Sequence, residues 1–162
     1  MEFEVNNIEE IVELIMKKMT ESSISTSNNS TNGVFKNVDE AIAEAKKAQT
    51  VLFSSKLELR ERIIASIRDT LKSHITELSE LAVKETGMGR IADKELKNRI
   101  AIEKTPGLED LKAFAFSGDD GLTVMELSPY GVIGAITPST NPSETVICNS
   151  IGMIAAGNAV IF

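Results

Sequence analysis

Two short apolar runs on either side of a helix-forming segment constrain the fold more than any other feature of this sequence. Residues 131–136 read Gly-Val-Ile-Gly-Ala-Ile, and residues 158–162 read Asn-Ala-Val-Ile-Phe. Continuous apolar runs of this length are typical of strands that are covered on both faces of a parallel sheet. Between them, Asn141 and Pro142 suit the N-cap and first turn of a helix that continues to about residue 156. The pattern predicts a β-α-β unit in an α/β fold.

Sequence signals place four helices between residues 37 and 104. Two of them begin with a polar residue followed three positions later by glutamate, namely Asn37 with Glu40 and Ser55 with Glu58. The third is expected to end at Gly87, and the fourth spans about 91–104. The residues expected to face inward on the first three helices are Ala41, Ala45, Ala48, Leu52, Leu59, Ile63, Ile67, Leu71, Ile75, Leu78, Leu81 and Ala82. Alternation over 122–127 predicts a strand.

Residues 1–20 predict an amphipathic helix. The apolar side chains at helical spacing are Ile8, Ile11, Val12, Ile15 and Met19. So short a helix is marginal alone in water, so its apolar stripe needs a partner surface, either on its own domain or on another protein. Of the twelve residues 21–32, ten are Ser, Thr or Asn, and we expect a flexible linker over 21–36.

Composition excludes several classes of function. Seventeen basic against 24 acidic residues give a net charge of −7, which argues against a nucleic-acid partner. One cysteine, Cys148, and one histidine, His74, exclude a disulfide framework and a Cys- or His-rich metal site. No apolar run reaches the roughly 18 residues of a membrane helix, and the start lacks the pattern of a secretory signal. We expect a protein of the reducing cytoplasm, with no membrane partner and no metal.

The loop 137–142 is the candidate site. In an open parallel sheet, ligands bind beyond the carboxyl ends of the strands, close to helix N-termini. This loop combines helix-end N–H groups with hydroxyls and one carboxamide, and it has no ionisable group. Such a set can donate hydrogen bonds to an oxyanion but supplies no nucleophile with its base. Asn141 is therefore either an oxyanion donor or a plain N-cap.

Other tempting residues have simpler interpretations. Cys148 falls inside the predicted 142–156 helix beside apolar neighbours, and we expect a buried, unreactive thiol. His74 is expected to be solvated or to cap a helix. Gly131 and Gly134 form only a partial phosphate-loop pattern, so we expect them to permit close packing in the sheet.

Several motifs resemble those of one known family. Residues 128–145 and 155–158 are similar to the aldehyde dehydrogenase superfamily, and more narrowly to the CoA-acylating propionaldehyde and acetaldehyde dehydrogenases of bacterial microcompartments. Residues 85–89, 97–98 and 105–111 fit the same subfamily. The resemblance implies N-terminal helices followed by the start of a Rossmann-like parallel sheet, truncated inside the NAD-binding domain.

The resemblance also implies an activity. Members of this subfamily convert an aldehyde, CoA and NAD⁺ into acyl-CoA and NADH through a cysteine thioester. Family chains are about three times as long, and their catalytic cysteine lies downstream of residue 162. The implied function is the N-terminal portion of such an enzyme, inactive alone. The alternatives are a non-enzymatic cargo module of the microcompartment and one chain of a split enzyme.

Residue roles follow only where motifs match. Pro138 to Pro142 corresponds to the segment Pro-Trp-Asn-Phe-Pro of many aldehyde dehydrogenases, which supplies an oxyanion-hole amide. Here Thr140 stands at the usual amide position and Asn141 follows it, and we favour Asn141 with Thr140 as second choice. The resemblance further implies that Ile136, Thr137 and Pro138 line the cofactor cleft. It implies a homo-oligomer at full length and a shell-protein partner for residues 1–20 in the microcompartment lumen.

Overall fold

The computed structural model describes residues 33–162. The helix predicted over 1–20 and most of the linker predicted over 21–36 lie outside the described residues. The fold below is that of the unit formed by residues 37–162. Among the helices described, none combines the length and the apolar character needed to cross a membrane.

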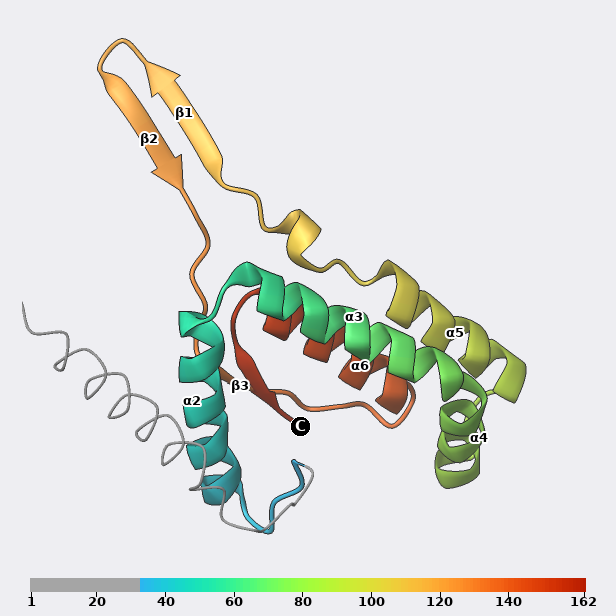
Figure 1. Cartoon of the computed structure of the whole chain (residues 1–162). Coiled ribbons are helices and arrows are strands. Elements are labelled where there is room, and N and C mark those ends of the chain that lie inside the picture. The colour runs from blue at the N-terminus through green and yellow to red at the C-terminus, as the bar shows by residue number, and fades with distance from the viewer. Residues whose placement is uncertain (1–32) are drawn as a thin grey trace, which may run out of the picture. The chain divides into compact units, whose positions relative to one another are not determined.

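Four helices form the first part of this unit, and Figure 1 shows how they are arranged. They are α2 (Val38–Ser54), α3 (Leu57–Ser73), α4 (Ile75–Thr86) and α5 (Ile91–Lys104). The N-cap prediction for Asn37 is confirmed, since its Oδ1 accepts a hydrogen bond of 2.9 Å from the Glu40 amide. The C-terminal prediction for Gly87 is also confirmed, because its φ of +66° is the left-handed conformation that glycine adopts without strain.

Two sequence predictions on these helices are wrong. Ser55 does not open α3, whose N-cap is Lys56. Ser55 instead closes α2, and its hydroxyl donates to the Val51 carbonyl at 2.6 Å. Because α3 begins at Leu57, one residue later than the Ser55–Glu58 pattern predicts, Ser55 lies outside it and its hydroxyl donates to an unpaired carbonyl of the preceding helix. Ala48 and Leu81 were expected to face inward, and both are exposed.

A hairpin follows the short helix η1 (Leu108–Asp110). It pairs β1 (Phe114–Gly118) with β2 (Gly121–Met125) in antiparallel register. The strand predicted over 122–127 corresponds to β2, whereas β1 was not predicted. All ten strand residues are exposed, and Figure 1 shows the hairpin extending away from the helices of its unit.

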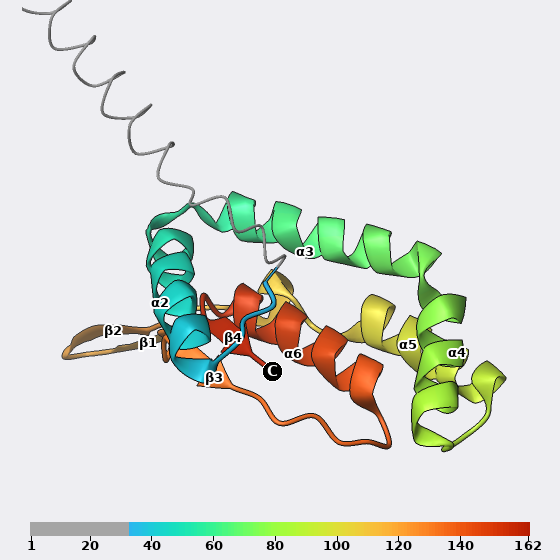
Figure 2. The same ribbon diagram turned by 90° about the horizontal axis from the view of Figure 1, so that it is seen from below.

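The predicted β-α-β unit is confirmed. Its elements are β3 (Val132–Gly134), α6 (Pro142–Ala155) and β4 (Ala159–Ile161), and the two strands pair in parallel. The expectation that these strands are covered on both faces is wrong, since most of their residues are only half-buried. Their sheet has two strands within the described part of the chain, with α2 and α6 against β4 (Figure 2).

The two glycines near β3 do not serve close packing, which corrects the sequence-based expectation. A Cβ at Gly131 or Gly134 would meet no atom within 4 Å. Gly131 is instead required by its backbone, because its φ is +114°. Its amide donates to Oδ1 of the buried Asn158 at 2.9 Å, which ties the start of β3 to the start of β4.

The core lies where α6 packs against α3, α4 and α5. Its buried apolar residues are Ile64, Ile75, Ala101, Ile102, Ile147, Ile151 and Ala155. Because α6 supplies three of them, this helix connects the helical part of the unit to the β3–β4 sheet.

Candidate functional site

The candidate site is the loop between β3 and α6, at the carboxyl end of β3. Figure 2 shows this loop running from β3 to the N-terminal end of α6. Ile136 is 97% exposed, and Pro138 and Thr140 are exposed as well. The structure therefore places the predicted site residues together on one accessible loop at a helix N-terminus.

Asn141 occupies the N-cap position of α6 without capping it through its side chain. The backbone carbonyl of Asn141 accepts hydrogen bonds from the amide and the hydroxyl of Thr145, at 3.2 and 2.7 Å. The N-cap position predicted for Asn141 is therefore confirmed, although its side chain makes no capping hydrogen bond. Its carboxamide remains available for other contacts.

Two lysines of α5 contact this loop. Nζ of Lys97 donates to Oδ1 of Asn141 at 3.1 Å, and Nζ of Lys94 donates to the backbone carbonyl of Thr140. The carboxamide Nδ2 of Asn141 lies 3.5 Å from Oγ1 of Thr140, at the limit of a hydrogen bond. The loop is thus held from α5 at two successive residues.

Lys94 is a buried cation with a buried carboxylate beside it. Lys94 is 3% exposed, and its Nζ lies 3.9 Å from Oε1 of Glu144. The hydroxyl of Ser143 donates to Oε2 of Glu144 at 3.1 Å, while Oε1 has no hydrogen-bond partner. Since buried charges are retained only when paired, each of the two residues requires the other.

Sequence reasoning did not assign a role to either lysine. In the sequence both lysines look like ordinary exposed residues of a charged helix. The partner of Lys94 lies 46 positions further along the chain, and that of Lys97 lies 44 positions further. Glu144 carried a usable signal, since it is the single charged residue between Pro138 and Phe162. A lone carboxylate in an apolar segment indicates a buried cation nearby.

The chemistry of this loop is that of hydrogen-bond donation. The N-terminus of α6 carries a partial positive charge, and two ammonium groups lie beside the loop. An oxygen that develops negative charge would be stabilised here. The loop itself has hydroxyl groups but no ionisable side chain that could activate one of them as a nucleophile.

The single thiol lies elsewhere. Cys148 is half-buried within α6, packs against the core, and its Sγ accepts a hydrogen bond of 3.1 Å from Oγ1 of Thr105. The other residue set aside on sequence, His74, is exposed and lies 2.9 Å from the Glu77 carboxylate. Within residues 33–162, no group of three His, Cys, Asp or Glu side chains is arranged to hold a metal ion.

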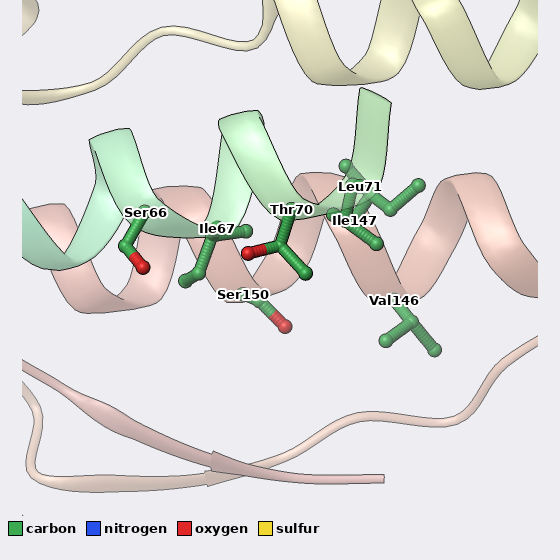
Figure 3. Close-up of a pocket in the computed structure, with 7 residues that line it drawn as sticks. All are labelled: Ser66, Ile67, Thr70, Leu71, Val146, Ile147 and Ser150. Atoms are coloured by element: carbon green, nitrogen blue, oxygen red, sulfur yellow. The ribbon is translucent and has the colours of Figure 1, made fainter. Parts of the chain in front are cut away.

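A separate groove of about 380 Å³ lies between α3 and α6. Its lining is mainly apolar, and Figure 3 shows hydroxyl groups from both helices among the lining side chains. They are Ser66, Ile67, Thr70, Leu71, Val146, Ile147 and Ser150. None of the predicted site residues contributes to it.

Comparison with known proteins adds the family. The model of the aldehyde dehydrogenase family matches residues 7–162. The chain belongs to the aldehyde dehydrogenase family. It is 47% identical over 156 residues to the acetylating acetaldehyde dehydrogenase EutE of Salmonella typhimurium, which covers 96% of this chain and 33% of that protein. The family recognised from the sequence motifs is thereby confirmed.

Solved structures agree with this assignment. A propionaldehyde dehydrogenase from the fucose utilisation microcompartment of Clostridium phytofermentans is 53% identical, with a TM-score of 0.77. The propionaldehyde dehydrogenase of Rhodopseudomonas palustris, with bound CoA and an acylated cysteine, is 53% identical with a TM-score of 0.78. Each match covers 80% of this chain and 30% of the solved one. The α/β fold class is confirmed, and the chain spans about a third of the length of its relatives.

Proposed function

We propose that this chain is the N-terminal portion of a CoA-acylating aldehyde dehydrogenase of a bacterial microcompartment. The proposed reaction converts a small aldehyde, CoA and NAD⁺ into acyl-CoA and NADH through a cysteine thioester. The observation that carries the proposal is the identity of 47% to an acetylating acetaldehyde dehydrogenase over nearly the whole chain. The accessible donor loop between β3 and α6 supports it.

In this proposal Asn141 donates a hydrogen bond to the oxygen of the aldehyde as that oxygen becomes negatively charged. Its Oδ1 is occupied by Lys97, so Nδ2 remains as the donor. A donor fixed before the reaction stabilises the transition state without reorganisation. Thr140 is the second choice, because its hydroxyl is exposed on the same loop.

Ile136, Thr137 and Pro138 are proposed to form one wall of the cofactor cleft. Ile136 and Pro138 offer exposed apolar surface at the carboxyl end of β3, where ligands of parallel sheets bind. These residues fit a wall of such a cleft but include no charged group for a phosphate. When bound, NAD⁺ would supply the acceptor for hydride. Residues 37–162 are accordingly proposed as the N-terminal part of the cofactor-binding domain.

The nucleophile is proposed to come from outside these 162 residues. Cys148 is half-buried in α6 and contacts Thr105, which does not suit attack on a substrate. We therefore expect no acyl transfer from this chain alone. Acyl-CoA formed by the purified chain would contradict this expectation and leave Cys148 to be reconsidered.

Residues 1–20 are proposed to bind a shell protein, with 21–36 as a linker and the microcompartment lumen as the location. The support is the apolar stripe at helical spacing in the sequence. Fused to a fluorescent reporter, residues 1–20 should place it with the shell. A variant with Ile11 and Ile15 changed to Ser should stay diffuse, and co-localisation of that variant would contradict the proposal.

The test of the activity uses a full-length enzyme that carries this segment. Formation of NADH from acetaldehyde or propionaldehyde should require CoA. Asn141→Ala should lower kcat by about 10²-fold or more. Thr140→Val is the matched variant, and a loss confined to it would move the donor role to Thr140. Unchanged turnover in both variants would remove the loop from the mechanism. A non-enzymatic cargo module would show no CoA-dependent activity at all.

A further inference from the structure

The feature that carries a further inference is the pair of α5 lysines beside the loop. Lys94 and Lys97 are three positions apart on α5, so they lie on the same face of that helix. Their ammonium groups contact successive residues, the carbonyl of Thr140 and the carboxamide of Asn141. One lysine therefore holds the backbone of the loop and the other holds a side chain.

The contact with Lys97 decides which end of the Asn141 carboxamide faces outward. The carboxamide carries an acceptor at Oδ1 and two donor hydrogens at Nδ2. An ammonium group can only donate, so it attracts Oδ1 and repels Nδ2. With Oδ1 held 3.1 Å from Nζ of Lys97, Nδ2 points to the other side of the group. One Nδ2 hydrogen makes a long contact of 3.5 Å with Oγ1 of Thr140, at the limit of a hydrogen bond, and the second hydrogen is left to bind an oxyanion.

Burial separates the roles of the two lysines. Lys94 is buried and paired with Glu144, so it is part of the packing of α5 against α6. Lys97 is exposed, and removing it creates no buried unpaired charge. A change at Lys97 should therefore alter the carboxamide without unfolding the chain.

We propose that Lys97 is a positioning residue, which fixes the orientation of the Asn141 carboxamide so that Nδ2 is presented as the oxyanion donor. The proposal rests on the function proposed above for Asn141. Lys94 supports it by holding the Thr140 carbonyl, which fixes the backbone from which that side chain extends.

The first measurement follows the Asn141 carboxamide in the 162-residue chain by ¹⁵N NMR. Its two Nδ2 protons are assigned by their loss in Asn141→Asp. In Lys97→Met these resonances should shift and exchange faster with water, whereas Lys97→Arg, which keeps a donor, should retain the original pattern. Lys104→Met removes an exposed lysine from the same helix and should leave them unchanged. Unaltered Asn141 resonances in Lys97→Met would overturn the positioning role.

The second measurement uses a full-length enzyme that carries this segment. Lys97→Met should lower kcat about tenfold, less than the loss of the donor itself, with KM for CoA unchanged. Lys97→Arg should recover most of the loss. If Asn141→Ala lowers kcat while Lys97→Met does not, the positioning role is overturned and the donor role stands. If the NMR changes occur but neither variant affects kcat, the proposed function of Asn141 fails instead.

Discussion

The two ends of α6 are each held by a long basic side chain from a neighbouring helix, yet only one of these cations suits the helix dipole. At the C-terminal end, the buried Arg60 of α3 donates to the Ala155 carbonyl at 3.3 Å. At the N-terminal end, the buried Lys94 of α5 lies at the positive end of the same helix. Cations are stabilised at helix C-termini and destabilised at N-termini.

The contact of Arg60 is explained by stability alone, whereas the position of Lys94 needs another explanation. Arg60 satisfies a carbonyl left unpaired by the end of the helix. Lys94 lies at the helix end where the backbone N–H groups point, so its charge is not stabilised by the helix. Its charge is instead balanced by Glu144, whose Oε1 is left without a hydrogen bond. We interpret the N-terminal end as an arrangement retained for the loop it holds.

The largest effect is expected from Lys94→Met. It removes the cation beside a buried carboxylate and should lower the free energy of unfolding by about 3 kcal/mol or more. Lys94→Met/Glu144→Gln should recover most of that loss, because no buried charge then remains unpaired. Urea denaturation of the full chain measures both. A single variant as stable as the unmodified chain would show that this pair is not important for stability.

The contact of Arg60 at the C-terminal end of α6 is tested by comparing two glycine variants. Gly157 and Gly87 both have left-handed backbones, with φ of +80° and +66°. A Cβ at Gly157 would lie 2.9 Å from the guanidinium of the buried Arg60, whereas one at Gly87 would meet nothing within 4 Å. Gly87→Ala should cost about 1 kcal/mol of backbone strain and Gly157→Ala about 2 kcal/mol or more, measured by urea denaturation. Equal losses would mean that Arg60 moves aside freely.

A smaller effect distinguishes two asparagines at helix N-termini. Asn37→Ala removes a side-chain cap and should destabilise the chain by about 1 kcal/mol. Asn141→Ala removes no cap hydrogen bond, so its loss should be only a few tenths of a kcal/mol. Thermal unfolding of the two variants compares them directly. A larger loss from Asn141→Ala than from Asn37→Ala would restore the capping interpretation.

The smallest effect concerns an exposed ion pair next to the buried one on α5. The Arg90 guanidinium donates to Asp93 at 2.7 and 3.2 Å, and this contact lowers the pKa of the Asp93 carboxyl. A carboxyl with a lowered folded-state pKa contributes stability above its unfolded pKa, and loses it as pH falls through the folded value. In Asp93→Asn the melting temperature should therefore fall slightly less as the pH is lowered than it does in the unmodified chain. A pronounced change would show that solvent screens this pair less than its exposure indicates.

The sequence predicted what local signals encode. The cap of Asn37, the left-handed Gly87 and the β3–α6–β4 unit each depend on neighbouring residues, and each is confirmed. The Ser55 prediction failed because α3 begins one residue later than the local pattern indicates, and Ser55 became the C-cap of α2. The exposed strand β1 was missed because little of it is buried and its pairing partner comes later in the chain.

Of the candidate site, the sequence predicted the loop but not the lysines that contact it. A polar loop between a strand and a helix points to a site, whichever residues surround it. The lysines that hold Thr140 and Asn141 lie more than 40 positions away on another helix. Which face of that helix would meet the loop depends on tertiary packing, and no local pattern encodes it.

The exposure of the hairpin has a consequence for the covalent chain. A two-stranded hairpin is marginally stable on its own, so its turn at 119–120 is the place within residues 37–162 where a protease would first cut. Such a cut would leave α6 on the second fragment. That fragment would still supply Ile147, Ile151 and Ala155 to the core built by the first. The two pieces should therefore remain associated after cleavage, as a noncovalent complex in which α6 packs against α3, α4 and α5 and the β3–β4 sheet packs against α2.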